Sequence, residues 1–394
     1  MSSNAPATDG SDELVLRGGH VIDPANDVDG TCDVAISGGK IARVASSIAT
    51  SRATRVIDVG GSYVVPGLVD IHVHYFATCP RLGVSPDDHA FPGAVTTAVD
   101  TGTAGWRNFE RFRTEVIDRV KCRVLAYVNI VSTGMEVPAN EQDPAQMDPA
   151  PTAEMARKHA DVVVGIKTAH FMQHGWTAVD RTLEAGELAG MPAMFDFAPK
   201  PERSYEDLLL KKMRPGDIHT HIYARHIPSL DENGRVYDYI WEARRRGVIL
   251  DLGHGAGSFW YRLAVPCLEQ GYQPDSISTD QHTGNVNGPV FTMLHTVSKM
   301  LNLGMSLKDL IHRSTVTPAR EIGRPELGTL SEGAEADVAV LQLRMGTFGY
   351  WDCGKGKLLG DRKLECLLTL RAGKIVYDPQ GLALDDWRTL GPTY

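Results

Sequence analysis

The chain has 394 residues, of which 42% are hydrophobic and 23% are charged, and its formal net charge is −9. These values are typical of a globular protein with one large domain and one smaller one. The acidic balance, without any basic run, argues against a nucleic acid partner, and the absence of a run of about 18 apolar residues argues against a membrane span.

The N-terminus and the cysteines bear on location. Residues 1–12 are polar and lack the basic and apolar regions of a secretory signal, so we interpret them as a disordered tail. The six cysteines lie far apart and form no CxxC pair, which is typical of reduced thiols rather than of a disulfide framework. We therefore expect a cytoplasmic protein with free thiols at Cys32, Cys79, Cys122, Cys267, Cys353 and Cys366.

Both ends of the chain have the pattern of short strands joined by tight turns. In the N-terminal part, Gly-Gly pairs separate alternating apolar runs, as hairpin turns do, at 18–19, 38–39 and 60–61. The same pattern returns near the C-terminus, at 336–344 and 364–378. We predict that residues 13–65 and 326–380 together form one small β-sandwich domain.

The middle of the chain, residues 66–325, alternates short apolar runs with helical stretches. Eight strands are expected, at 68–74, 94–102, 123–131, 161–167, 191–198, 217–223, 247–254 and 276–280. Helices are expected between them, at 108–120, 151–160, 180–190, 237–247 and 291–304. Eight such units over about 250 residues predict an α/β fold, a (β/α)8 TIM barrel. An open doubly wound sheet would usually have a glycine-rich phosphate turn after its first strand, and none is present.

One long segment interrupts this alternation. Residues 136–151, EVPANEQDPAQMDPAP, are rich in Pro, Asp and Gln and follow the third expected strand. We expect a long loop there, which could act as a lid.

The first expected strand ends in two histidines. His72 and His74 are two residues apart, so both rings point to the same face of the strand. Such a pair can bind one metal ion, and the alternative is a hydrogen-bonded pair in the core. Because the strand ends of such a barrel form its active-site face, the metal hypothesis is favoured by position.

A lysine and an aspartate end two other strands. Lys167 closes VVVGIK, where a charged amine would be costly unless paired. It could extend to the rim, or it could be carboxylated by CO2 so that its two oxygens bridge two metal ions. Asp280 closes SISTD and could hold a metal and transfer a proton, or it could cap the following segment.

Further polar residues follow strand ends. Either His221 or His254 could complete a second metal site, whereas His219 is expected to be packed in the core. Asp196, within an apolar run, needs a cation or hydrogen-bond donors, either a metal or an arginine. Four residues are expected to contact a substrate, although each could equally be loop structure: His170, Tyr223, His254 and His282.

Together these motifs resemble the amidohydrolase superfamily, and most closely its dihydroorotase-like amidohydrolase/deacetylase branch. The similarity rests on PGLVDIHVH, GIK, a strand ending in histidine and SISTD, in that order. It extends over nearly the whole chain, through LVLRGGHVIDP, VTTAVDTGTAGWRNF, DLGHGAGSFW, MSLKDLIHRSTVTPAREIG and LGTLSEGAEADVAVL.

The resemblance implies a role for each matching position. His72 and His74 match the pair that holds the more buried metal, and Lys167 matches the carboxylated bridging lysine. His221 matches a ligand of the second metal. Asp280 matches the aspartate that ligates the first metal and serves as acid and base.

Two positions depart from the family pattern. Asp196 stands where the fifth strand usually ends in a histidine, so either Asp196 ligates the second metal, or that metal is weaker, replaced or absent, with His254 as another candidate. Ala169 and His170 stand where many relatives have an arginine two residues after the lysine, so a substrate contact could differ.

The expected function is that of a metal-dependent hydrolase acting on a small molecule. The resemblance implies cleavage of an amide-type C–N bond, in an N-acyl amino acid, a cyclic amide or imide or a similar compound, by a metal-bridging hydroxide with Asp280 as acid and base. Alternatives are an acyl-ester hydrolase on the same site, a lyase or isomerase on the same scaffold, and a non-catalytic scaffold protein. Two Zn²⁺ ions are expected, with Mn²⁺, Fe²⁺ or Co²⁺ as substitutes, and homo-oligomers are common in the family.

Overall fold

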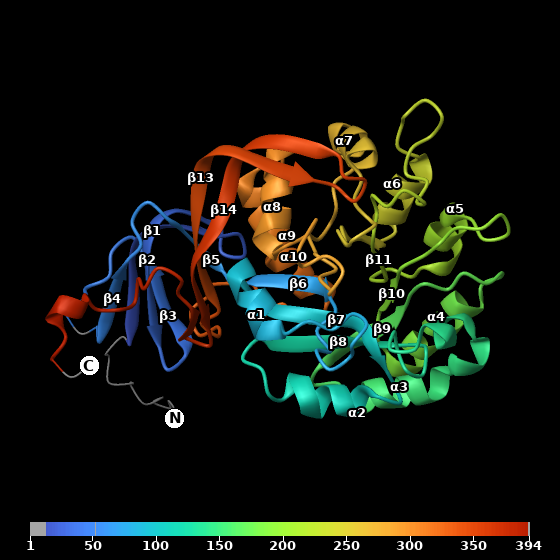
Figure 1. The fold of residues 1–394 in the computed structure, drawn as a ribbon, viewed down its shortest axis with the longest axis horizontal. Coiled ribbons are helices and arrows are strands. Elements are labelled where there is room, and N and C mark those ends of the chain that lie inside the picture. Colours follow the sequence, from blue (N-terminus) through green and yellow to red (C-terminus); the bar gives the residue numbers. More distant parts are fainter. Residues whose placement is uncertain (1–12, 52, 393–394) are drawn as a thin grey trace, which may run out of the picture.

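The computed structural model describes residues 13–51 and 53–392, so the predicted disordered tail at 1–12 lies outside the described residues. Two sheets organise this part of the chain (Figure 1). One has eight strands and combines residues from both ends of the chain, and the other has seven parallel strands from the middle.

The eight-stranded sheet joins the two ends of the chain through one antiparallel pair, β5 with β13. Its order is β15-β14-β13-β5-β1-β2-β3, and β4 also pairs with β1. Its strands form a single hydrogen-bonded sheet, and the two-layered sandwich stays a prediction. The strands are β1 (Leu14–Asp23), β2 (Val28–Ser37), β3 (Lys40–Ala45), β4 (Arg55–Asp58), β5 (Tyr63–Pro66), β13 (Val338–Trp351), β14 (Lys357–Arg371) and β15 (Lys374–Tyr377).

The Gly-Gly pairs behave differently from one another. Gly38 and Gly39, both at positive φ, form the hairpin turn predicted between β2 and β3. The pair at 18–19 lies inside β1, where the register shifts between Leu16 and Gly19, so it is a bulge and not a turn. The pair at 60–61 joins β4 and β5, which both run parallel to β1 and therefore do not form a hairpin.

The seven-stranded sheet follows chain order, and every neighbouring pair is parallel. All residues of β7 are buried, as expected of a strand covered on both faces. Seven of the eight predicted strands are thus present: β6 (Leu68–Val73), β7 (Val95–Gly105), β8 (Arg123–Asn129), β9 (Val163–Thr168), β10 (Ala193–Phe195), β11 (Ile218–His219) and β12 (Ile249–Leu250).

The eighth predicted strand, 276–280, is not a regular strand. Instead, Ser276 forms a parallel bridge with Asp251, and Gln281 forms one with Val73. The amide of Asp280 also donates to the carbonyl of His72 over 2.6 Å. This segment therefore contacts both edges of the sheet, while a positive φ of 51° at Asp280 ends its extended conformation.

Helices cover the outside of the parallel sheet (Figure 1). The five predicted helices appear as α2 (Phe109–Phe112) continued by a π-helical turn at Arg113–Ile117, α3 (Pro149–Lys158), α4 (Thr177–Ala189), α6 (Asp238–Arg245) and α8 (Met293–Asn302). The sequence analysis missed α1 (Pro86–Ala90), α5 (Tyr205–Asp207), α7 (Tyr261–Glu269), α9 (Leu307–Arg313) and α10 (Val316–Glu321). None of the described helices has both the length and the apolar character needed to cross a membrane.

The predicted long loop contains short turns, and the C-terminal hairpin packs on a helix of the larger domain. Within 136–151, two short 3-10 turns form at Pro138–Gln142 and Pro144–Gln146. The long β13–β14 hairpin extends from the small sheet across α8 toward α7 (Figure 1). It is attached to α8 through Asn302, whose amide donates to the carbonyl of Arg362 over 2.7 Å.

Arg123, at the start of β8, links the two sheets. Its guanidinium donates to the Asp337 carboxylate and to the Thr97 hydroxyl, each over 2.7 Å. Both partners of the ion pair are mostly buried, with side-chain exposures of 15% and 10%. Removal of Arg123 would leave Asp337 with Arg371, 3.3 Å away, and with the amide of Ala372.

We predict that Arg123→Met lowers the free energy of unfolding by about 2 kcal/mol, because Asp337 loses its main cationic partner. Urea unfolding followed by circular dichroism measures this change. Arg17→Met is the matched control, since the Arg17–Asp58 pair is exposed and should contribute nothing measurable. Equal loss of stability in the two variants would contradict the prediction.

Candidate active site

Three predicted histidine ligands meet around the carboxylate of a fourth predicted ligand, Asp280. Asp280 Oδ1 lies 3.1 Å from Nε2 of His74 and 3.4 Å from Nε2 of His72. His221 approaches the other oxygen, with 4.0 Å between its Nε2 and Asp280 Oδ2. Atoms of His72, His221 and Asp280 lie within 4.8 Å of one another, and all three residues are buried. This is a group of nitrogen and oxygen donors that could hold a metal ion.

Three residues of the site have left-handed backbone conformations. The φ angles are 57° at His170, 68° at His221 and 51° at Asp280. Such angles are uncommon outside glycine and are unfavourable unless surrounding contacts enforce them. The surrounding structure therefore holds these side chains in positions that the local sequence alone would not favour.

Hydrogen bonds orient the histidine rings toward the carboxylates. His221 donates from Nδ1 to the carbonyl of Gly253 over 2.6 Å, so in the neutral ring the Nε2 lone pair is free. His74 contacts the Thr103 hydroxyl through Nδ1 over 2.7 Å. Burial keeps the pKa of His72 well below its usual value, with a further contribution from Lys167. A neutral imidazole is the form that ligates a metal.

Lys167 lies in β9 with its amine inside the protein. Its side chain is fully buried, and its Nζ has no hydrogen-bond partner among the described residues. Burial lowers its pKa, against the opposing effect of Asp196 and Asp280. Residue 102, at φ 80°, is a glycine, which leaves space for the lysine side chain. Any other residue there would place its Cβ 2.9 Å from Lys167 Cγ, which is too close. A buried amine with no hydrogen-bond partner among the described residues is the feature that the predicted carboxylation of this lysine requires.

Asp196 faces histidines rather than an arginine. Its Oδ2 lies 3.5 Å from Nε2 of His170 and 3.8 Å from Nε2 of His221. Burial alone would raise the pKa of this carboxyl, but the charges of His221, His170 and Lys167 hold it well below its usual value. Of the two candidates for the second metal, Asp196 is the one placed beside His221.

His254, predicted as a second-metal or substrate ligand, does not line the cavity on which the other candidates converge. The ring is fully buried and stacks on Phe259. Its Nδ1 donates to the carbonyl of Gly255 over 3.0 Å, and its Nε2 lies 2.5 Å from Nζ of Lys299. Both ring nitrogens therefore have protein partners. The sequence could not indicate this, because Lys299 is 45 residues away.

A cavity of about 540 Å³ opens in front of the candidate ligands. This volume is typical of a small-molecule site. Two of the predicted substrate contacts, His170 and His282, line it, together with Asp196, His221, Asp280, Met172, Ala198, Pro199, His226, Ala256, Gly257 and Ser258.

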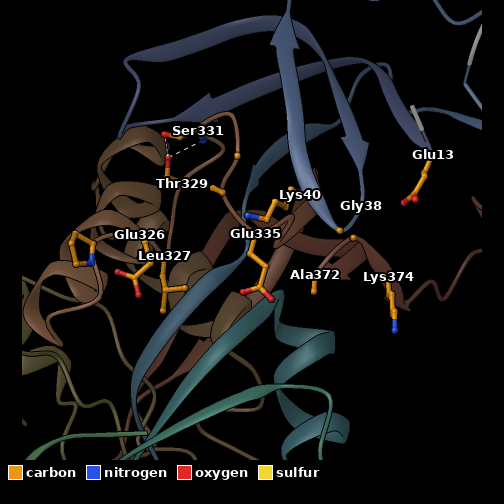
Figure 2. A pocket seen from close by; sticks show the side chains of 15 residues that line it. Glu13, Gly38, Lys40, Glu326, Leu327, Thr329, Ser331, Glu335, Ala372 and Lys374 are labelled. Atoms are coloured by element: carbon orange, nitrogen blue, oxygen red, sulfur yellow. Dashed lines mark hydrogen bonds between the residues drawn. The ribbon is translucent and has the colours of Figure 1, made fainter. Parts of the chain in front are cut away.

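A larger cavity, about 940 Å³, lies at the small sheet (Figure 2). Its charged lining includes Lys40, Glu335 and Lys374, and Thr329 and Ser331 hydrogen-bond to each other beside it. None of the predicted ligands lines this cavity. The candidate ligands Asp196, His221 and Asp280 line the smaller cavity instead.

Tyr223, predicted as a substrate contact, does not line the smaller cavity either. Its side chain is fully buried, and its hydroxyl donates to the carbonyl of Tyr272 over 2.6 Å. It packs against Phe259 in the core. His219 is also buried, beside Tyr205, as predicted.

The sequence analysis missed residues that support the site. Glu141, from the long loop, accepts from Nδ1 of His170 over 3.0 Å and pairs with Arg81. Thr220 and Asp251 are buried behind His72. Residues such as Thr220 and Asp251 have no distinctive spacing in the sequence that would predict a supporting role. Only the position of Asp251 near the end of a predicted strand could have indicated that it lies near the site.

Comparison with known proteins places the chain in a family. A deacetylase of Agrobacterium fabrum is 30% identical over 321 residues, which cover 79% of this chain and 78% of that protein. The chain belongs to the amidohydrolase family. Residues 262–376 also match the model described as the amidohydrolase family. The predicted membership of this superfamily is therefore confirmed, and the chain is an enzyme of a metal-dependent superfamily.

Other relatives agree with this placement. A deacetylase of Enterococcus faecalis is 29% identical over 88% of this amidohydrolase chain and 95% of its own length. A crystal structure of an adenine deaminase superposes with a TM-score of 0.86 and 28% identity, covering 94% of this chain and all of that one. A dihydroorotase structure has a TM-score of 0.83 and 26% identity over 92% of this chain and 98% of that one.

We predict that Tyr223→Phe lowers the free energy of unfolding by about 1 kcal/mol, because the buried carbonyl of Tyr272 loses its donor. Since the hydroxyl does not face the cavity, kcat and KM should equal those of the unmodified enzyme. His282→Ala is the contrasting variant, and we expect its KM to rise. A Tyr223→Phe enzyme with altered KM and unaltered stability would return Tyr223 to the substrate contacts.

Proposed function

We propose that this amidohydrolase cleaves an amide-type C–N bond of a small molecule, such as an N-acyl amino acid or a cyclic amide or imide. The observation that carries the proposal is the grouping of three histidines with two carboxylates, together with the buried amine of Lys167, for which the described residues supply no hydrogen-bond partner. The names of the relatives, deacetylase and dihydroorotase, support hydrolysis at such bonds. An acyl ester is the second candidate, because the same site could attack either carbonyl.

The donor set fits two divalent cations, Zn²⁺ first, with Mn²⁺, Fe²⁺ or Co²⁺ as substitutes. One would be held by His72, His74 and Asp280, and the other by His221 and Asp196. Carboxylated Lys167 would be shared by both. When bound, such cations act as Lewis acids and lower the pKa of water enough for nucleophilic attack near neutral pH.

The protein residues supply proton transfer and orientation. The Asp280 carboxylate lies at the cavity wall, where it can accept a proton from attacking water and return it to the leaving nitrogen. His170 is held by Glu141 at the cavity wall, and with His282 it would position the substrate. His254 and Tyr223 have no part in this assignment.

The proposal also covers the closure of the barrel, the cellular location and the oligomeric state. We count the segment 276–281, which contacts both edges of the parallel sheet, as the eighth member of a closed (β/α)8 barrel. All six cysteines are free, which supports a cytoplasmic setting. We also propose that the protein forms a homo-oligomer, and this proposal rests on the family resemblance alone.

We predict that turnover in ¹⁸O-labelled water places one labelled oxygen in the carboxylic acid product, as measured by mass spectrometry. N-acyl amino acids, cyclic amides and acyl esters should be screened with metal-loaded enzyme.

With the substrate found by this screen, Asp280→Asn should lower kcat by about 10²- to 10⁴-fold, because proton transfer and one ligand are lost. Product formation without solvent oxygen would contradict hydrolysis and favour a lyase or an isomerase.

We predict that Lys167→Ala binds fewer metal ions than the two per chain expected of the unmodified enzyme, and that its kcat falls by at least about 100-fold. Metal analysis by mass spectrometry measures the first quantity. In the unmodified enzyme, ¹³C-bicarbonate should yield a carbamate signal by NMR that the variant lacks. Undiminished turnover in Lys167→Ala would refute the bridging role.

A further inference from the structure

A chain of buried hydrogen bonds runs from His72 away from the cavity. Nδ1 of His72 lies 2.9 Å from the hydroxyl of Thr220, and that hydroxyl donates to Asp251 Oδ2 over 2.7 Å. Thr220 and Asp251 are fully buried, and His72 is 1% exposed. The three residues come from different parts of the sheet: His72 from β6, Thr220 from the residue after β11, and Asp251 from the residue after β12.

The direction of these bonds determines the form of the imidazole. A hydroxyl has one proton, and Thr220 gives it to Asp251, so the same oxygen can only accept from His72. Nδ1 of His72 must then carry its proton. In a neutral ring this leaves the lone pair on Nε2, the nitrogen that faces Asp280 over 3.4 Å.

Asp251 is held in the orientation that this arrangement needs. Ser276 donates to its Oδ1 over 2.9 Å, and Ser278 donates to its Oδ2 over 2.7 Å. Ser278 itself accepts from the amide of Gly253 over 2.9 Å, which leaves its proton for the carboxylate. With three hydroxyl donors, the carboxylate serves as an acceptor toward Thr220.

The backbone around Thr220 leaves room for its hydroxyl only because residue 253 is glycine. A Cβ at Gly253 would lie 2.1 Å from Thr220 Oγ1 and 2.6 Å from Nδ1 of His221. The φ of 47° at this position also favours glycine. One glycine thus permits the hydroxyl behind His72 and supplies the carbonyl that binds His221.

We propose that Thr220 and Asp251 are positioning residues that hold His72 in its Nδ1–H form and thereby set the affinity of the site for its metal ion. The inference rests on the proposed metal site. Partners behind metal-ligating histidines typically change metal affinity about 10- to 100-fold when they are removed. The structure assigns this role to a threonine and an aspartate from two other strand ends.

The test is a titration of metal-free protein with Co²⁺, in which the visible absorption of bound Co²⁺ measures binding. We expect Thr220→Val to raise the dissociation constant about 10- to 100-fold, because Nδ1 of His72 loses its acceptor. Thr220→Ser, which restores the hydroxyl, should stay within about threefold of the unmodified protein. Thr182→Val is the matched control, since the buried Thr182 hydroxyl donates to Ala178 in α4, away from the site.

Each outcome is decisive. Co²⁺ binding by Thr220→Val as tight as that of the unmodified protein would overturn the inference and leave the proposed function intact. Equal weakening in Thr220→Ser and Thr220→Val would also overturn it, because shape and not the hydroxyl would then matter. Failure of the unmodified protein to bind Co²⁺ would overturn the metal centre itself, and with it the proposed function.

Discussion

The constraint on which the rest of this site depends is the buried amine of Lys167, which has no hydrogen-bond partner in the described part of the chain. A charged amine in that position would be strongly unfavourable, and even a neutral one loses the hydrogen bonds that it makes in water. The protein nevertheless makes space for Lys167 by placing Gly102 against its side chain. The carboxylates of Asp196 and Asp280 act on this amine and oppose the lowering of its pKa by burial.

The same region contains the backbone conformations that a folding chain would otherwise avoid. His170, His221 and Asp280 all have positive φ, and each contributes a side chain to the cavity. Such conformations persist only where packing and hydrogen bonds enforce them. The parallel sheet and its helices therefore supply the favourable free energy that offsets these unfavourable backbone conformations.

The small sheet is connected to the site region through its long hairpin. The carbonyl of Trp351, at the end of β13, accepts from Lys299, and Lys299 contacts His254. Cys353 and Phe259 add further contacts between the hairpin and the segment after β12. The residues from the C-terminal part of the chain thus help to shape the loops beside the cavity.

Sequence alone was sufficient for features that depend on local pattern. The alternation of apolar runs located seven parallel strands, and the spacing of His72 and His74 indicated a shared face because side chains alternate along a strand. Lys167 and Asp280 were found because a polar residue that ends an apolar run is costly without a partner. The resemblance of these motifs in order indicated the family.

Tertiary structure decided which polar side chains meet. His254 and Tyr223 look equivalent to His170 and His282 along the chain, yet Lys299 and Tyr272 engage the first two, and the cavity receives the others. Thr220 and Asp251 support His72 from positions 148 and 179 residues later in the chain. Such pairings depend on which strands become neighbours and on the direction of each hydrogen bond, and neither is encoded in the spacing of residues along one strand.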